Sequence, residues 1–165
     1  MNRLLFAGPI GTICAFAVMH FALAADVPKE GAYDVSTCFE RNVTRIDYSP
    51  TRYAWSYEET GMSHSNPPGG LFDDEVVRCV GATASFDGKR SGGATCVGTA
   101  KDGDKRLARF YYGDDGKLHR EAVGGTGKYD GMVTIGTVEP VGPQPKIQTG
   151  PAKYCNHQTG TYKLK

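Results

Sequence analysis

Residues 75–99 read EVVRCVGATASFDGKRSGGATCVGT, and the fold that we predict rests on the pattern of these residues. The stretch has two β-rich halves around Asp87-Gly88, a dipeptide that is a strong signal for a two-residue β-hairpin turn. Cys79 stands eight residues before Asp87 and Cys96 eight residues after Gly88, so such a hairpin pairs them directly. Counted outward from the turn, they form a non-hydrogen-bonded pair, where Cα atoms approach to about 4.5 Å. That separation suits a disulfide, so we predict a Cys79–Cys96 bond.

The first 24 residues have the features of a secretory signal peptide. Arg3 supplies a positive charge, residues 10–21 are mostly apolar, and Ala22-Leu23-Ala24 provides the small residues of a cleavage site. The apolar stretch is about a dozen residues long, whereas a membrane-spanning helix needs about 20. We therefore predict a secreted or periplasmic protein with one domain over residues 25–165 and no membrane segment after cleavage.

The other cysteines suggest a second disulfide. Cys14 lies in the leader, which leaves an even number of cysteines for an oxidising compartment. Four cysteines allow three connectivities. If Cys79 and Cys96 are bonded, Cys38 and Cys155 join the first strand to the last. No Cys-x-x-Cys pair is present, so a redox or metal role for the cysteines is disfavoured.

The composition favours a turn-rich protein without a strongly charged partner. Glycine accounts for 22 and proline for 9 of the 165 residues, which is more than in an average globular chain. Removal of Arg3 with the leader leaves 18 basic and 18 acidic residues, because the full chain has 19 and 18. A neutral chain has no field that would attract nucleic acid or an anionic membrane.

Short β-rich segments and turns continue along the chain. Helical spacing of apolar residues over ten or more positions is absent after the leader. We count about eight strands joined mostly by short turns, which predicts an all-β, eight-stranded antiparallel barrel. A two-sheet β-sandwich is the alternative. We expect residues 61–71 to form a loop at the barrel rim and residues 141–151 to run extended across one end. Further Asp-Gly turn signals are Asp102-Gly103, Asp115-Gly116 and Asp130-Gly131.

A glycine-rich motif, GGTGKYDGM at residues 124–132, resembles a signature of the allene oxide cyclase-like barrels and the dirigent proteins. The chain is also similar to small secreted bacterial proteins of unknown function on that barrel. The resemblance covers roughly 13 residues and implies the eight-stranded barrel, with Tyr129 plugging the barrel end. It carries over no catalytic residue, and it leaves room for a homo-oligomer, because plant members of both groups tend to oligomerise. The motif glycines are Gly124, Gly125, Gly127 and Gly131.

Three aromatic residues mark a candidate ligand site. Tyr53, Trp55 and Tyr57 alternate with small residues, so one face of a strand is wholly aromatic. If that face points inward, it lines a pocket for a flat or apolar molecule. The alternative interpretation is that the rings only fill the core.

The motifs found in the rest of the chain limit the possible functions of this aromatic face. No hydrolase, phosphate-loop, cofactor or metal-ligand spacing is present, so we predict no cofactor and no metal. The leading hypothesis is a non-enzymatic barrel that binds a small apolar or aromatic molecule. One alternative is a cyclase- or isomerase-like enzyme that acts by positioning its substrate, and another is an interaction module with a filled core. A buried carboxylate with a raised pKa near the aromatic face favours the enzyme, and Glu40, Glu58 and Glu59 are the candidates.

Overall fold

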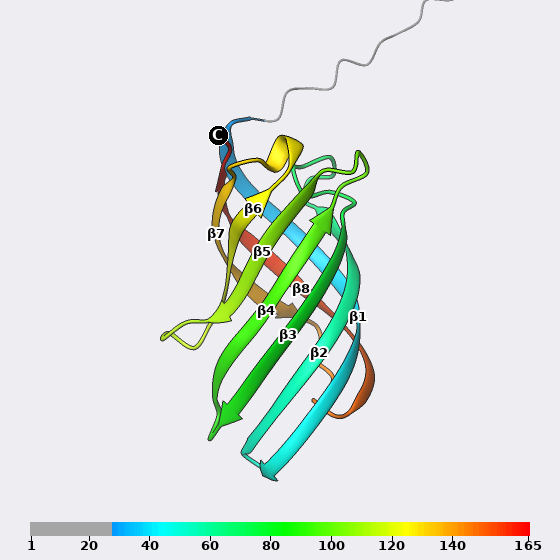
Figure 1. The fold of residues 1–165 in the computed structure, drawn as a ribbon, viewed down its shortest axis with the longest axis vertical. Helices are drawn as coiled ribbons and strands as arrows, with labels where there is room; N and C mark the ends of the chain where they lie inside the picture. Colours follow the sequence, from blue (N-terminus) through cyan, green and yellow to red (C-terminus); the bar gives the residue numbers. More distant parts are fainter. Residues whose placement is uncertain (1–27) are drawn as a thin grey trace, which may run out of the picture.

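The computed structural model describes residues 28–165, so the proposed signal peptide lies outside the described part. Eight antiparallel strands form a closed barrel in which β8 returns to pair with β1 (Figure 1). The predicted eight-stranded barrel is therefore confirmed, and the alternative sandwich is wrong. No helix in the described part is long and apolar enough to cross a membrane. The strands are β1 (Glu30–Ser49), β2 (Arg52–Ser65), β3 (Val76–Phe86), β4 (Lys89–Thr99), β5 (Lys105–Tyr112), β6 (Leu118–Gly125), β7 (Val133–Val141) and β8 (Gly150–Lys163).

The hairpin of β3 and β4 has the register that the sequence predicted. Phe86 pairs with Lys89 at the turn, and Cys79 pairs with Cys96. The two cysteines form a disulfide with their Cα atoms 4.1 Å apart. Both side chains are buried and face the barrel interior.

The second predicted disulfide is also confirmed. Cys38 of β1 pairs with Cys155 of β8, and the disulfide between them joins Cα atoms 4.0 Å apart across a sequence separation of 117. Cys38 is exposed, so this bond lies on the outside of the barrel. Two disulfides indicate that the protein folds in an oxidising environment.

The strands are strongly staggered around the barrel. One interior row of paired residues leaves β1 at Tyr33 and returns to β1 at Val43, ten residues further along the strand. A shear of ten over eight strands corresponds to a tilt of about 40° from the barrel axis, which is typical of closed barrels. The complete row is Tyr33, Gly160, Gly136, Arg120, Phe110, Ala94, Gly81, Tyr57 and Val43.

Aromatic rings cover glycines on neighbouring strands inside the barrel. A Cβ atom at Gly81 would lie 2.4 Å from the Tyr57 ring, and one at Gly61 would lie 2.8 Å from the Phe39 ring. Gly61 lies within β2. Our expectation of a loop over residues 61–71 is therefore wrong at its start. β2 continues to Ser65 because its pairing with β1 extends to Val35. The loop to β3 spans residues 66–75.

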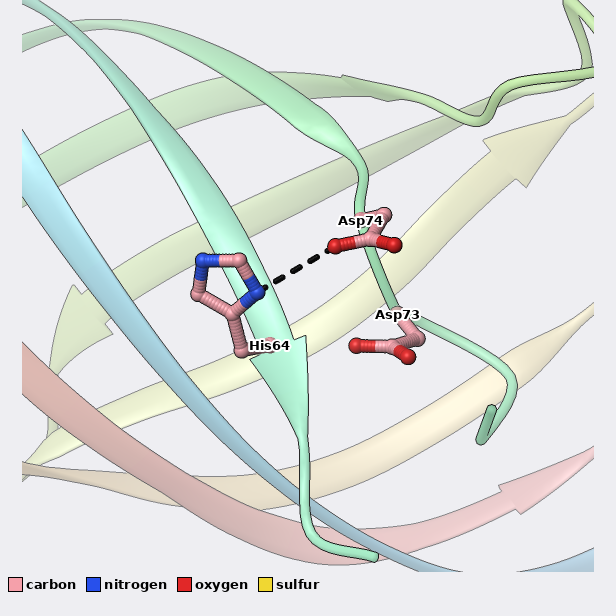
Figure 2. Close-up of side chains that lie close together, drawn as sticks. All are labelled: His64, Asp73 and Asp74. Atoms are coloured by element: carbon pink, nitrogen blue, oxygen red, sulfur yellow. Dashed lines mark ion pairs between the residues drawn. The ribbon is translucent and has the colours of Figure 1, made fainter. Parts of the chain in front are cut away.

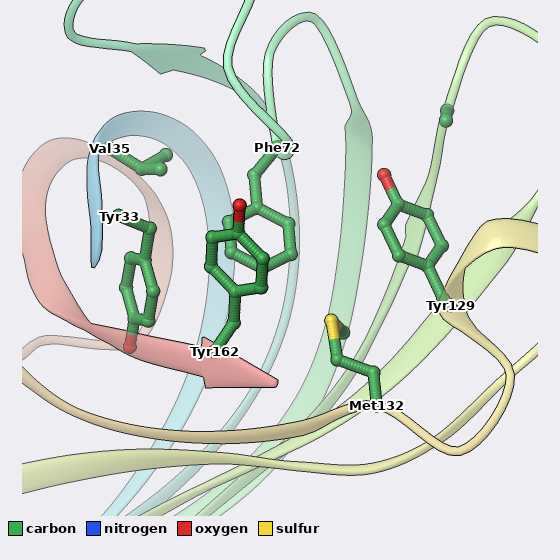
Figure 3. Close-up of a cluster of buried hydrophobic side chains, with 7 residues drawn as sticks. Tyr33, Val35, Phe72, Tyr129, Met132 and Tyr162 are labelled. Atoms are coloured by element: carbon green, nitrogen blue, oxygen red, sulfur yellow. The ribbon is translucent and has the colours of Figure 1, made fainter. Parts of the chain in front are cut away.

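One end of the barrel is plugged by aromatic side chains (Figure 3). The loop after β2 inserts Phe72, and the glycine-rich segment after β6 inserts Tyr129 from a short 3-10 turn, Gly127–Tyr129. Both side chains are 0% exposed, and their rings stack with centroids 6.2 Å apart. Tyr129 Oη donates a hydrogen bond to the Leu71 carbonyl at 2.9 Å. Tyr129 is thus fixed at this end of the barrel by both packing and a hydrogen bond.

Backbone geometry explains two of the motif glycines. Gly127 and Gly131 have φ values of +53° and +66°, a region that favours glycine because it has no Cβ atom. The carboxylate of Asp104 fills the space beside Gly127 and accepts a hydrogen bond from Lys128 N at 2.8 Å. Gly124 and Gly125 end β6 just before this turn.

Candidate functional site

The opposite half of the barrel contains a cavity of about 680 Å³. Such a volume is in the range of small-molecule sites. Four of the lining residues belong to a buried cluster and form the inner wall: Phe39, Phe110 and the disulfide-bonded Cys79 and Cys96. The aromatic residues around the cavity are Phe39, Trp55, Tyr57, Phe110, Tyr112 and Tyr154.

The cavity contains a partly buried ionic cluster. Arg41 Nε lies 2.9 Å from Glu59 Oε2, and Tyr154 Oη donates a hydrogen bond to the same oxygen at 2.9 Å. The Arg41 guanidinium carbon lies 4.5 Å from the centre of the Tyr57 ring and 4.0 Å from that of Tyr154. Two aromatic faces and one carboxylate therefore hold this cation in place.

Burial shifts the protonation of the cluster. Glu59 is 7% exposed, and burial raises the pKa of its carboxyl group, although Arg41 and Tyr154 oppose the rise. Burial also raises the pKa of Tyr57 to about 12, with the Glu59 charge as the second cause. The pKa of Tyr154 is raised for the same two reasons. Both hydroxyls therefore remain protonated donors at neutral pH.

Part of the cluster is free to bind a ligand. Arg41 Nη1, Arg41 Nη2 and Glu59 Oε1 have no hydrogen-bond partner within residues 28–165, and none of them is fully buried. Since both residues line the cavity, these atoms open on it. They offer hydrogen-bond donors and an acceptor side by side. The opposite charges of Arg41 and Glu59 largely cancel.

A proline-containing segment lies at the cavity mouth. Residues 142–149 connect β7 to β8 and contribute Gln144, Pro145 and Ile147 to the cavity lining. Arg45 holds this segment, because its Nη1 bonds the Ile147 carbonyl and its backbone N–H bonds Thr149 Oγ1 at 3.1 Å. The segment between the strands is shorter than the predicted range 141–151, because β7 continues to Val141 and β8 begins at Gly150.

The three predicted ligand-site residues do not all reach the cavity. Trp55 and Tyr57 line it, and Trp55 is 5% exposed. Tyr53 points to the same face but lies nearer the mouth, where its ring stacks with the Arg45 guanidinium at 3.8 Å. The aromatic face is thus continuous, since the rings of Tyr53 and Trp55 are 5.6 Å apart.

Of the three candidate glutamates, only Glu59 faces the interior. Glu58 is exposed, and Glu40 is an exposed partner of Lys153 on the outer surface. Arg41 and Tyr154 were not predicted as site residues. A signal for them exists, however, because a Cys38–Cys155 pair that faces outward places Phe39 and Tyr154 inward as direct partners.

A second group of polar side chains lies at the plugged end (Figure 2). His64, Asp73 and Asp74 offer potential metal-ligand atoms that lie within 4.8 Å of one another. These aspartates already have protein partners. Asp73 accepts bonds from the backbone N–H groups of Ser65 and Gly69, and Asp74 pairs with Lys101 and with His64. The group therefore stabilises the loop after β2, and we assign no metal to it.

No protein-family model, no curated protein sequence and no solved structure gives a significant match.

Proposed function

We propose that this protein is a secreted or periplasmic barrel, of the allene oxide cyclase-like type, that binds a small flat molecule in the open half of its interior. One observation carries the proposal: a cavity of about 680 Å³ is lined by aromatic rings and contains the accessible Arg41–Glu59 pair on its wall. Rings supply apolar contact area, and a few fixed polar groups orient the ligand.

The polar pair suggests which head group the ligand carries. Arg41 is largely neutralised by Glu59, so a second carboxylate placed beside them would meet Glu59 at close range. A neutral group that accepts a hydrogen bond from Arg41 and donates one to Glu59, such as a carboxamide or a hydroxyl beside a carbonyl, matches the free atoms. We therefore propose a flat, apolar molecule with a neutral polar head.

Trp55 allows a direct test, because it is the only tryptophan in the chain and it lines the cavity. We expect N-phenyl-1-naphthylamine, a neutral aromatic probe, to quench Trp55 fluorescence with a stoichiometry of one. Ala94→Phe, which places a ring in the cavity, should abolish binding. Ala82→Phe, on the outer face of β3, should not. Binding that is absent from the parent protein, or unchanged in Ala94→Phe, would overturn the proposal.

The head group can be tested with matched ligands. Naphthalene-2-carboxamide should bind the parent protein more tightly than 2-naphthoate does. In Glu59→Gln the cation of Arg41 loses its counter-charge, so 2-naphthoate should gain roughly tenfold in affinity. An unchanged order of affinities in the variant would refute the role of the Arg41–Glu59 pair but leave the aromatic cavity in place.

An enzymatic role is the second candidate, and Glu59 is the observation that favours it. A buried carboxyl group with a raised pKa, inside a cavity and beside the aromatic face, is suited to proton transfer. If the ligand is a substrate, Glu59→Gln should abolish its turnover while Glu40→Gln leaves turnover intact. A ligand recovered unchanged after long incubation with the parent protein would support a binding role alone.

A further inference from the structure

The plugged half of the barrel contains ionised side chains that the cavity does not use. Glu75 is fully buried and Arg106 nearly so. Arg106 Nε and Nη2 lie 2.8 Å and 2.7 Å from Glu75 Oε2. These two residues therefore form a neutral pair in the core.

Arg120 adds a positive charge without a counter-charge. Its side chain is 1% exposed, and all three of its guanidinium nitrogens lack a hydrogen-bond partner in residues 28–165. The guanidinium carbon lies 4.4 Å from the centre of the Phe72 ring and 4.6 Å from that of Tyr33. Ring faces stabilise a cation, but they offer no acceptor to its N–H groups.

The charge on Arg120 persists at neutral pH. Burial, followed by the charge of Arg106, lowers the pKa of Arg120 to about 9. A group with that pKa is still mostly protonated at pH 7. The core around Phe72 thus holds two cations and one carboxylate, and an uncompensated buried charge is very unfavourable.

Other polar atoms in the same region also lack partners. Tyr33 Oη, Arg106 Nη1 and the second carboxylate oxygen of the ion pair, Glu75 Oε1, are buried and unbonded within the described chain. Arg106 stacks on the Phe72 ring at 4.8 Å, and the rings of Tyr33 and Phe72 meet edge to face at 5.3 Å (Figure 3). Donors from Tyr33, Arg106 and Arg120 therefore surround one aromatic side chain. Buried donors of this kind normally bond ordered water or an ion.

The position of the Tyr33 hydroxyl depends on glycine. A Cβ atom at Gly136, which pairs with Arg120, would lie 1.9 Å from Tyr33 Oη, and one at Gly160 would lie 2.7 Å from it. Because Gly136 and Gly160 have no side chains, the Tyr33 hydroxyl can lie beside the strand position that pairs with Arg120.

We propose that the plugged half of the barrel binds one small monovalent anion of the chloride class, held by Arg120 with Arg106 Nη1 and Tyr33 Oη. An anion both accepts hydrogen bonds from the free N–H groups and neutralises the excess positive charge. A water molecule can accept the hydrogen bonds but leaves the charge in place. The anion must be small, because Phe72 and Tyr129 close this end of the barrel. The site is independent of the proposed ligand cavity.

Chloride dependence of stability tests the proposal. Urea unfolding is measured while chloride replaces gluconate at constant ionic strength. If one anion binds only the folded protein, the unfolding equilibrium constant falls tenfold for each tenfold rise in chloride above its Kd. Arg120→Met should lose this dependence, and Arg78→Met, which removes an exposed arginine from the outer face of β3, should keep it. Equal dependence in the parent protein and Arg120→Met would overturn the proposal.

A second measurement does not depend on any variant. The parent protein is refolded from urea in sodium bromide with its disulfides intact and then crystallised. An anomalous bromide peak within hydrogen-bond distance of the Arg120 guanidinium supports the site. Water without anomalous signal at that position, or a guanidinium packed against the rings with no neighbour, refutes it.

Discussion

The hydroxyl of Tyr33 occupies the space that a side chain at Gly136 would require. Tyr33 lies on β1 and Gly136 on β7, and the intervening strand contributes Gly160 between them. The tyrosine therefore crosses the β8 and β7 backbones at two positions that carry no side chain. Because β1 and β7 are not paired with each other, this contact joins strands that the backbone ladder leaves separate.

Gly136→Ala should destabilise the barrel. The new Cβ would also lie 2.4 Å from the Thr159 carbonyl, which belongs to the backbone and cannot turn away. We expect a loss of about 3 kcal/mol in the free energy of unfolding, at the upper end for overpacking, measured by urea titration. Gly124→Ala is the matched control, since a Cβ atom at Gly124 would meet nothing within 4 Å beyond its chain neighbours. A Gly136→Ala protein as stable as Gly124→Ala would contradict the packing described.

Removal of the outer disulfide should reduce stability but leave ligand binding intact. Cys38 and Cys155 close a loop of 117 residues, for which the chain-entropy relation gives about 5 kcal/mol, against about 3 kcal/mol for the 17-residue separation of Cys79 and Cys96. We expect Cys38→Ala/Cys155→Ala to unfold at lower urea yet to bind N-phenyl-1-naphthylamine with unchanged affinity in native buffer. A weakened affinity would mean that the outer bond also shapes the cavity.

The sequence predicted the fold because several local signals agreed. Asp87-Gly88 set the register of one hairpin, and the two cysteines eight residues from it supplied an independent check on that register. The end of β2 was predicted wrongly, since Gly61 and the Ser-Asn-Pro residues after it are typical of a loop. Long-range pairing with β1, and the Phe39 ring over Gly61, extend the strand despite this local preference.

The candidate site was predicted only in part. An alternating aromatic face indicates which side of a strand is apolar, so Trp55 and Tyr57 could be named from sequence. The contact of Arg41 and Tyr154 with Glu59 could not be predicted, because these two residues reach Glu59 from β1 and β8 through tertiary pairing. Their meeting depends on the shear of the barrel, which no local pattern specifies.

Glu59 should make stability depend on pH in a defined direction. Burial raises the pKa of the folded-state carboxyl above its ordinary value of 4.5, so the folded protein holds this proton more tightly than the unfolded chain. Its contribution to stability is full below pH 4.5 and is lost as the pH rises through the folded-state pKa. The stability of the parent protein relative to Glu59→Gln should therefore fall over that window, as measured by urea unfolding from about pH 4 to about pH 7.

Glu40 provides a control of opposite sign. Its pKa is lowered by the hydrogen bond and charge of Lys153, so its contribution is present above pH 4.5 and is lost as the pH falls through the lowered value. Relative to Glu40→Gln, the parent protein should not lose stability as the pH rises. If the two comparisons have the same slope, burial does not dominate the titration of Glu59.

Arg45 should control access to the cavity through the segment 142–149. Arg45→Met removes the guanidinium bond to the Ile147 carbonyl and the stacking on Tyr53, while its aliphatic side chain keeps much of the packing. Without this bond the segment should open more often, so trypsin should cut after Lys146 several-fold faster at native pH. The matched control is Arg52→Met, which removes an exposed ion pair with Asp87 elsewhere at this end.

The bound probe should also dissociate faster from Arg45→Met, with little change in the urea midpoint, because surface ion pairs contribute little to stability. Cleavage at an equal rate in both variants would show that the prolines and Thr149 hold the segment without Arg45.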